Sequence, residues 1–288
     1  MDFQTRKNMK EKMAFGALRL FSFSIIAILF FILGYIVING ISVVSFDFLT
    51  KMPEDGMTKG GILPAIIGTL CLMVVSLAIA FPIGVFSGIY LNEYIKDGWF
   101  KRFINLMTNN LSGIPSIVFG LFGMQFFVNQ LGWGDSIIAG SFTLAILVLP
   151  VIIRTTEESL KAVSNTFREA ASGLGASKWQ TTYSVVLPIG MPNILTGLIL
   201  SMSRVSGETA PILFTVAAYF LPQLPHSIFD QVMALPYHLY VVATSGNNIT
   251  ESRPIAFGTA LVLIFIVLVL NLLANWLRKV LGSKVKMN

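Results

Sequence analysis

The chain contains six long stretches without Asp, Glu, Lys or Arg, except that one arginine and one glutamate lie within the fifth. A helix needs about 20 apolar residues to cross a bilayer, and it bonds its own backbone groups, as lipid requires. Only 12% of the residues are charged, against about 25% in soluble domains. The sequence therefore predicts an all-α membrane protein with six transmembrane helices, at Leu20–Phe46, Gly60–Asn92, Phe103–Gly134, Ser136–Ile153, Trp179 to about Tyr219, and Pro254–Leu277.

Positively charged residues gather on one side of these spans. Sixteen of the 20 Lys and Arg residues lie before the first span, between spans two and three, between spans four and five, or after the last. Only Lys51, Lys59 and Arg253 lie on the other side. Because cytoplasmic loops carry the excess of Lys and Arg, we expect both the N and the C terminus to be cytoplasmic.

Several kinds of chemistry lack the residues that they need. No Gly-Lys dipeptide occurs, so the chain has no P-loop to bind ATP. His226 and His238 have no further candidate ligands nearby, so we expect no metal. The single cysteine, Cys71, excludes a disulfide framework. The basic residues lie between apolar spans rather than on one folded face, which argues against a nucleic-acid partner. We predict a protein that is not an enzyme and holds no cofactor of its own.

A polar segment at about residues 156–188 separates the fourth and fifth spans. Alanines permit close approach of a partner, Gly175 permits a turn between two short helices, and Pro188 suits the first turn of the next helix. An ordinary amphipathic loop helix would also be polar at this place. The spacing nevertheless favours a compact helical surface that docks on another protein, formed by Glu169, Ala170, Ala171, Gly175, Leu187 and Pro188.

This spacing resembles the coupling loop of ABC-importer permeases. From about Gly60 to its end, the chain resembles the permeases of phosphate-specific ABC importers, of the PstA type. The resemblance divides the chain into residues 1–59, with the first helix and an outer loop, and a permease core at residues 60–288. The stretches that carry it are Gly60–Thr69, Pro115–Gly123, Leu149–Glu158, Gly175–Thr181, Gly207–Pro211 and Leu235–His238.

The resemblance implies a multi-pass protein of the bacterial inner membrane that works with partners. These are a second, homologous permease subunit, a dimer of ATPase subunits that bind ATP and Mg, and an extracytoplasmic phosphate-binding protein. The coupling loop would transmit closure of the ATPase dimer to spans three to six. Two alternatives stay open, namely a permease for another oxyanion such as sulfate or molybdate, and an ion-driven secondary transporter.

Arg204 and Glu208 are the charged residues at membrane depth, four positions apart in the fifth span. On a helix they lie on one face, and an intramembrane charge costs about 2.5–3.5 kcal/mol on insertion scales. The pair either neutralises itself structurally or lines a substrate path together with Thr209. Arginine can donate two hydrogen bonds to an oxyanion such as phosphate. The resemblance implies that Arg204 and Glu208 matter for transport.

Two further features have two interpretations each. Arg154, with Glu157 and Glu158, either anchors the fourth span at the interface among solvated carboxylates or forms an ion pair at a gate. The glycines and prolines inside the spans indicate either close helix packing or broken helices that line a cavity. The most favourable place for a break is Ser112–Ser116.

Overall fold

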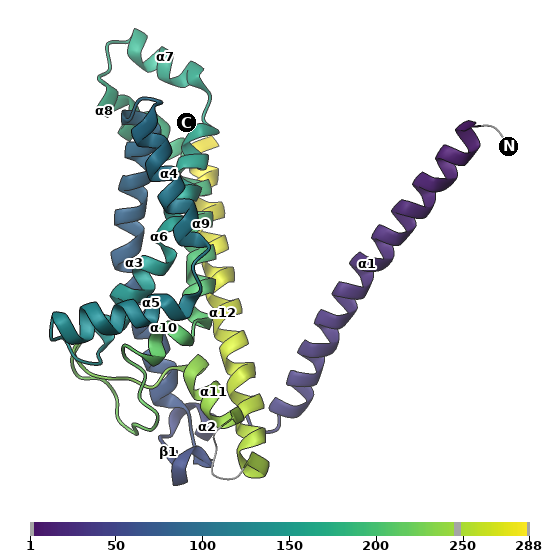
Figure 1. The fold of residues 1–288 in the computed structure, drawn as a ribbon, viewed down its shortest axis with the longest axis vertical. Helices are drawn as coiled ribbons and strands as arrows, with labels where there is room; N and C mark the ends of the chain where they lie inside the picture. Colours follow the sequence, from purple (N-terminus) through teal and green to yellow (C-terminus); the bar gives the residue numbers. More distant parts are fainter. Residues whose placement is uncertain (1–2, 245–248, 287–288) are drawn as a thin grey trace.

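A computed structural model describes residues 3–244 and 249–286. Its centre is a bundle of four long helices that lie side by side, as Figure 1 shows. Their apolar side chains form the main core, in which Leu144, Leu147, Val148 and Ile152 are fully buried. The four helices are α3 (Leu63–Ile89), α6 (Ile137–Lys161), α9 (Leu187–Gly207) and α12 (Ile249–Lys286).

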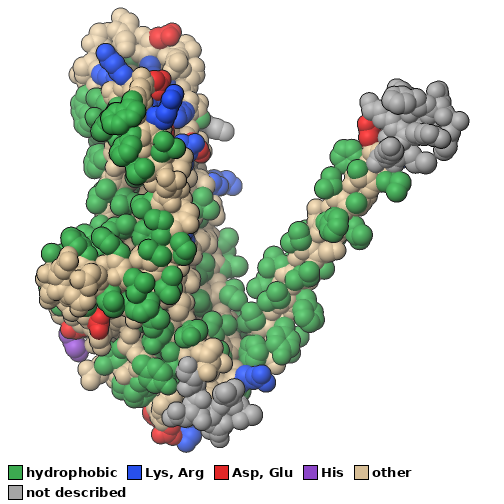
Figure 2. All heavy atoms as spheres, in the orientation of Figure 1, with side chains coloured by type: hydrophobic (Ala, Val, Ile, Leu, Met, Phe, Trp, Pro, Cys, Tyr) green, Lys and Arg blue, Asp and Glu red, His purple; other side chains and the backbone are tan. Residues whose placement is uncertain are grey.

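Within the described residues, five helices are long and apolar enough to cross a membrane, and a bent helix pair forms a sixth span when it is counted as one. Figure 2 shows hydrophobic side chains along the length of the molecule, while charged ones gather mainly towards its two ends. A bilayer would meet the hydrophobic part. The fold is therefore that of the expected all-α, multi-pass membrane protein.

α3 and α6 lie in close contact because glycines face bulky residues across their interface. A Cβ on Gly84 would lie 2.6 Å from Ile152 Cγ2, and one on Gly88 would lie 2.6 Å from Thr156 Cβ. Small residues let helix backbones approach closely in membranes. Close packing is therefore the correct interpretation of these glycines.

The third span is broken where the sequence predicts a break. α4 (Trp99–Ser112) and α5 (Ser116–Gly123) meet at a bend of 99°, and α5 continues as the π-helical η3 (Met124–Gln130). Pro115 precedes α5 and disfavours a helical conformation for the residue before it. In Figure 1, α5 and η3 project sideways from the bundle, whereas α4 runs along it.

The prediction that the fifth span continues to about Tyr219 is wrong. α9 ends at Gly207, Glu208 has an extended backbone, and a short helix α10 follows at Ala210–Leu213. Pro211 has no backbone N–H to continue α9. The chain then forms a loop that is closed by a bridge between Ala217, shortly after α10, and Val232.

The end of the molecule opposite α7 and α8 is built from short elements. These are α2 (Phe46–Thr50), β1 (Pro53–Glu54), η1 (Asp55–Met57), β2 (Lys59–Gly60) and α11 (Leu235–Thr244), as Figure 1 shows. α11 packs mainly on α12, and the hydroxyl of Thr69 on α3 accepts a hydrogen bond from the Leu235 N–H at 2.8 Å. The rest of the segment 221–253 includes residues 245–248, which lie outside the described residues.

α1 (Phe3–Gly40) diverges from the bundle and meets it mainly at α12 (Figure 1). The Tyr35 ring contacts the Phe257 ring edge-on at 5.5 Å between centroids, and a Cβ on Gly40 would lie 2.7 Å from the Phe257 carbonyl oxygen. The large apolar side chains of α1 from Met13 to Phe31 are exposed. This helix therefore has apolar side chains around its whole circumference.

Candidate functional site

The segment between α6 and α9 folds into two short helices joined by a turn, as its sequence predicts. α7 (Asn165–Gly173) begins at Ser164, whose hydroxyl accepts a hydrogen bond from the Thr166 N–H. α8 (Lys178–Thr181) begins with a reciprocal capping box between Ser177 and Gln180. Gly175 lies between them with φ +83°, a conformation that glycine adopts without strain. The whole segment lies at one end of the bundle in Figure 1.

The residues proposed for docking are accessible in this arrangement. Glu169 and Ala170 are exposed on α7, Ala171 is half-buried, and Gly175 is exposed in the turn. Leu187 and Pro188 form the first turn of α9, which continues the π-helical η4 (Thr182–Val186). α6 extends to Lys161, so the first residues of 156–188 belong to that helix.

The large apolar side chains of this segment are also exposed, although they are not among the predicted docking residues. Leu174 is 90% exposed, directly before the Gly175 turn. Phe167 and Trp179 are also exposed, and Trp179 stacks on Tyr183 at 6.0 Å between ring centroids. In the sequence, these residues could have been recognised as apolar side chains inside an otherwise polar loop. Exposed apolar groups rimmed by polar residues mark protein interaction sites.

Arg204, Glu208 and Thr209 lie where α9 ends and α10 begins. The Arg204 Nε lies 3.4 Å from Glu208 Oε1, although Glu208 follows the last helical residue. Both charged side chains are partly exposed, and Thr209 is half-buried. The structure thus brings the two charges together but leaves the guanidinium with donors that can reach a further acceptor.

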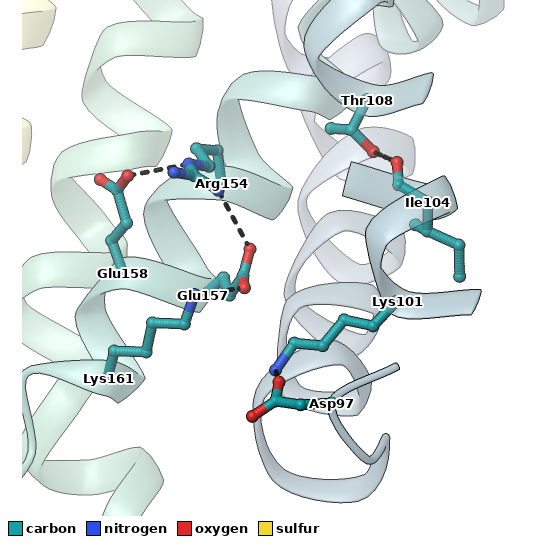
Figure 3. A network of polar contacts seen from close by, with 8 residues as sticks. All are labelled: Asp97, Lys101, Ile104, Thr108, Arg154, Glu157, Glu158 and Lys161. Atoms are coloured by element: carbon teal, nitrogen blue, oxygen red, sulfur yellow. Dashed lines mark hydrogen bonds and ion pairs between the residues drawn. The ribbon is translucent and has the colours of Figure 1, made fainter. Parts of the chain in front are cut away.

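Arg154 joins a network of ion pairs near the C-terminal end of α6, shown in Figure 3. Its Nε lies 2.8 Å from Glu158 Oε1, and its Nη1 lies 3.5 Å from Glu157 Oε2. Lys161 Nζ lies 2.5 Å from the other oxygen of Glu157. Glu157 is only 1% exposed, so the expectation of solvated carboxylates is wrong for this residue. Arg154 and Lys161 thus supply partners of opposite charge to this buried side chain.

A second ion pair in Figure 3 lies at the start of α4. Lys101 Nζ is 2.9 Å from Asp97 Oδ1. This hydrogen bond and the positive charge lower the pKa of the Asp97 carboxyl below its ordinary value. Together with Lys161, these residues line a polar groove of about 710 Å³. In the described part of the chain, no group of three or more His, Cys, Asp or Glu residues could hold a metal ion.

The chain belongs to the family of binding-protein-dependent transport system inner membrane components, whose model matches residues 80–287. It is 36% identical to the "Probable ABC transporter permease protein YqgI" of Bacillus subtilis, over 98% of this chain and 99% of that protein. It is 35% identical to the "Phosphate transport system permease protein PstA" of Haemophilus influenzae, over 84% of each chain. A protein of the same name from Mycobacterium leprae is 38% identical over 85% of this chain and 80% of that protein.

Solved structures share the fold. A chain of a bacterial ABC transporter involved in the import of the acidic polysaccharide alginate superimposes with a TM-score of 0.66, at 16% identity, over 96% of this chain and 98% of that one. A chain of the inward-facing MetNI methionine ABC transporter superimposes with a TM-score of 0.61, at 17% identity, over 76% of this chain and 95% of that one. Both similarities support the arrangement of helices described above.

Proposed function

We propose that this chain is a permease subunit of an ATP-driven phosphate importer in a bacterial inner membrane. The observation that carries the proposal is the exposed α7–α8 segment, with its Gly175 turn and apolar side chains, at one end of a membrane-spanning bundle. A secondary transporter has no use for such a docking surface. Identity of 35–38% to proteins named as phosphate transport permeases supports phosphate as the substrate.

The α7–α8 segment would be the cytoplasmic end, so both chain termini would also be cytoplasmic. A dimer of ATPase subunits, which bind ATP and Mg, would dock on Glu169, Ala170 and Ala171. A second, homologous permease subunit would complete the path across the membrane. An extracytoplasmic binding protein would deliver phosphate at the opposite end, near α2 and α11.

Arg204, Glu208 and Thr209 are the residues proposed to line the path. A guanidinium can donate charge-assisted hydrogen bonds to two phosphate oxygens. Glu208 can accept a hydrogen bond from a protonated phosphate oxygen, and it also keeps Arg204 from holding the anion too tightly. The 3.4 Å separation of this pair supports the assignment, because a loose pair can open towards a substrate.

The test is ATP-dependent uptake of radiolabelled phosphate into cells that lack this chain and every other phosphate importer, with and without its restoration. Sulfate and molybdate are present as competitors. Rescue that resists both competitors supports the proposal. Rescue blocked by either oxyanion would change the substrate, and uptake that needs no ATPase partner would overturn the ATP-driven mechanism.

A further inference from the structure

One ion pair ties the α7–α8 segment to the bundle, and its partners are 75 residues apart in the sequence. Arg168 on α7 donates from Nη2 to Glu93 Oε1 at 2.6 Å and from Nε to Glu93 Oε2 at 3.2 Å. Glu93 belongs to η2 (Tyr90–Tyr94), the π-helical end of α3. The guanidinium and the carboxylate thus form two parallel hydrogen bonds, the geometry that holds such groups in a fixed orientation.

The same guanidinium also closes the end of α6. Its Nη2 donates to the Leu160 carbonyl at 2.9 Å, and its Nη1 donates to the Val163 carbonyl at 2.7 Å. The last carbonyls of a helix have no partner within the helix, and a cation near them interacts favourably with the helix dipole. One side chain therefore joins α3, α6 and α7 at a single point.

Both side chains of this ion pair are largely buried. The side chain of Glu93 is 7% exposed and that of Arg168 is 20% exposed. Removing one member of a buried pair leaves the other charge without compensation, which is strongly unfavourable. By contrast, the Lys51–Asp47 pair at the far end of the molecule is more than half exposed on both sides.

The second short helix contacts the same turn of α3. Lys178, the first residue of α8, places its Nζ 5.3 Å from the centroid of the Tyr94 ring. This distance is within the range of a cation–π interaction. Both halves of the α7–α8 segment therefore hold η2, through neighbouring residues, on either side of the Gly175 turn.

We propose that the Glu93–Arg168 pair is a positioning contact that transmits movement of the α7–α8 segment directly to α3. The inference rests on the proposed function, because that movement would come from the ATPase. The α7–α8 segment is joined to α6 and α9 by the backbone, and the Glu93–Arg168 pair adds α3 to the helices that its movement reaches. From α3 the movement passes to α6 through the close contacts of Gly84 and Gly88.

The experiment uses the assembled transporter in liposomes, with ATPase subunits and phosphate-loaded binding protein. Phosphate uptake and ATP hydrolysis are measured together, because their ratio reports coupling whereas a merely structural role would lower both alike. We expect Glu93→Gln and Arg168→Gln each to lower the phosphate imported per ATP by at least about fivefold, the lower end of typical site-to-site coupling. Asp97→Asn, which breaks the pair between Lys101 and the 93% exposed carboxylate of Asp97, is the control and should keep the wild-type ratio.

A double variant and a milder variant complete the test. If Arg168 acts through Glu93, the double variant should lose no more coupling than either single one. An unchanged ratio, or losses that add up in the double variant, would overturn the inference. If the Glu93→Gln transporter does not assemble, the phosphate imported per ATP is measured for Arg168→Lys instead. This variant keeps the positive charge but not the planar fork. A wild-type complex that imports no phosphate would instead refute the proposed function.

Discussion

Gly88 of α3 lies against Thr156 of α6 so closely that a Cβ on Gly88 would be 2.6 Å from the Thr156 Cβ and 3.0 Å from the Ile153 carbonyl oxygen. Neither neighbour is the flexible end of a side chain, so the two helices cannot make room locally. The interface through which α3 and α6 move together therefore depends on the absence of a single methyl group.

Gly88→Ala should destabilise the protein. Overpacking of a tight core costs about 1–3 kcal/mol, and here it would separate α3 from α6. Thermal unfolding in detergent measures the change. Gly34→Ala is the matched control, because Gly34 is a helical glycine on α1 with no atom within 4 Å of the new methyl group. An equal melting temperature for Gly88→Ala and the wild type would contradict the tight interface.

Gly175→Ala should disturb the α7–α8 segment without any steric clash. The φ of Gly175 is +83°, and no neighbouring atom lies within 4 Å of a Cβ built there. An L-residue in the left-handed region costs about 1–2 kcal/mol, so the turn should change its angle. We expect fewer ATPase subunits to co-purify, at an unchanged level of the chain in the membrane. Gly173→Ala, with the same open surroundings in α7, should retain them.

Glu169→Arg should abolish docking of the ATPase and leave membrane insertion intact. Glu169 is exposed on α7, so reversing its charge should leave the fold unchanged. A wrong charge at an interface costs several kcal/mol, which corresponds to a more than about 100-fold weaker association. Co-purification of the ATPase measures the effect, with Glu54→Arg at the other end as the control. Coupled uptake at the wild-type rate in Glu169→Arg would refute docking at this residue.

Arg204→Gln should reduce phosphate uptake while the transporter still assembles. Hydrogen bonds to charged groups contribute about 1.5–3 kcal/mol, so a loss of roughly 10- to 100-fold is expected. The measurement is the initial rate of uptake, normalised to the assembled complex. Arg19→Gln on α1, an exposed arginine far from α9, serves as the control. Uptake at the wild-type rate would leave Arg204 with a structural role alone.

Acid should destabilise the protein through His238, which is buried in α11 outside the membrane spans. Burial lowers the pKa of His238 to about 4 from 6.5, and its Nδ1 lies 3.3 Å from the Thr259 hydroxyl. Above pH 6.5 the imidazole is neutral in both the folded and the unfolded state. As the pH falls from 6.5 to 4, the unfolded chain binds a proton that the folded chain does not. Stability should then decrease, by about 3 kcal/mol at most.

Thermal unfolding at several pH values between 7.5 and 4.5 tests this dependence. His238→Asn removes the titrating group and should flatten the decrease between pH 6.5 and 4, whatever its effect on stability at pH 7.5. His226→Asn is the control, since His226 lies exposed in the loop before α11. A pH profile of His238→Asn that parallels the wild type would show that another group is responsible.

Hydropathy and backbone chemistry made several parts of this fold predictable. Whether an uncharged stretch can cross a bilayer depends on its own length and not on its neighbours, so the spans could be located from the sequence. The break before α5 was predictable because Pro115 acts on its own backbone. The two short helices around Gly175 were predictable for the same local reason.

Features that depend on distant contacts could not be predicted in this way. Glu93 appeared as an ordinary residue at the end of a span, because its partner Arg168 is 75 positions away. Glu157 was expected to be solvated, and its burial follows from how α6 packs. The end of α9 at Gly207 was missed because the residues up to Tyr219 remain apolar, and an apolar composition does not report where a helix stops.

The divergence of α1 also bears on how the chain is made. Its main contact lies on α12, which begins about 200 residues after α1 ends. At roughly 5–20 residues per second, a ribosome needs roughly 10–40 s to synthesise that interval. During this time α1 resides in the bilayer before its partner exists. The apolar surface of its uncharged part, residues 20–40, lets α1 remain there as a solitary helix, so it packs on the bundle only once α12 has been made.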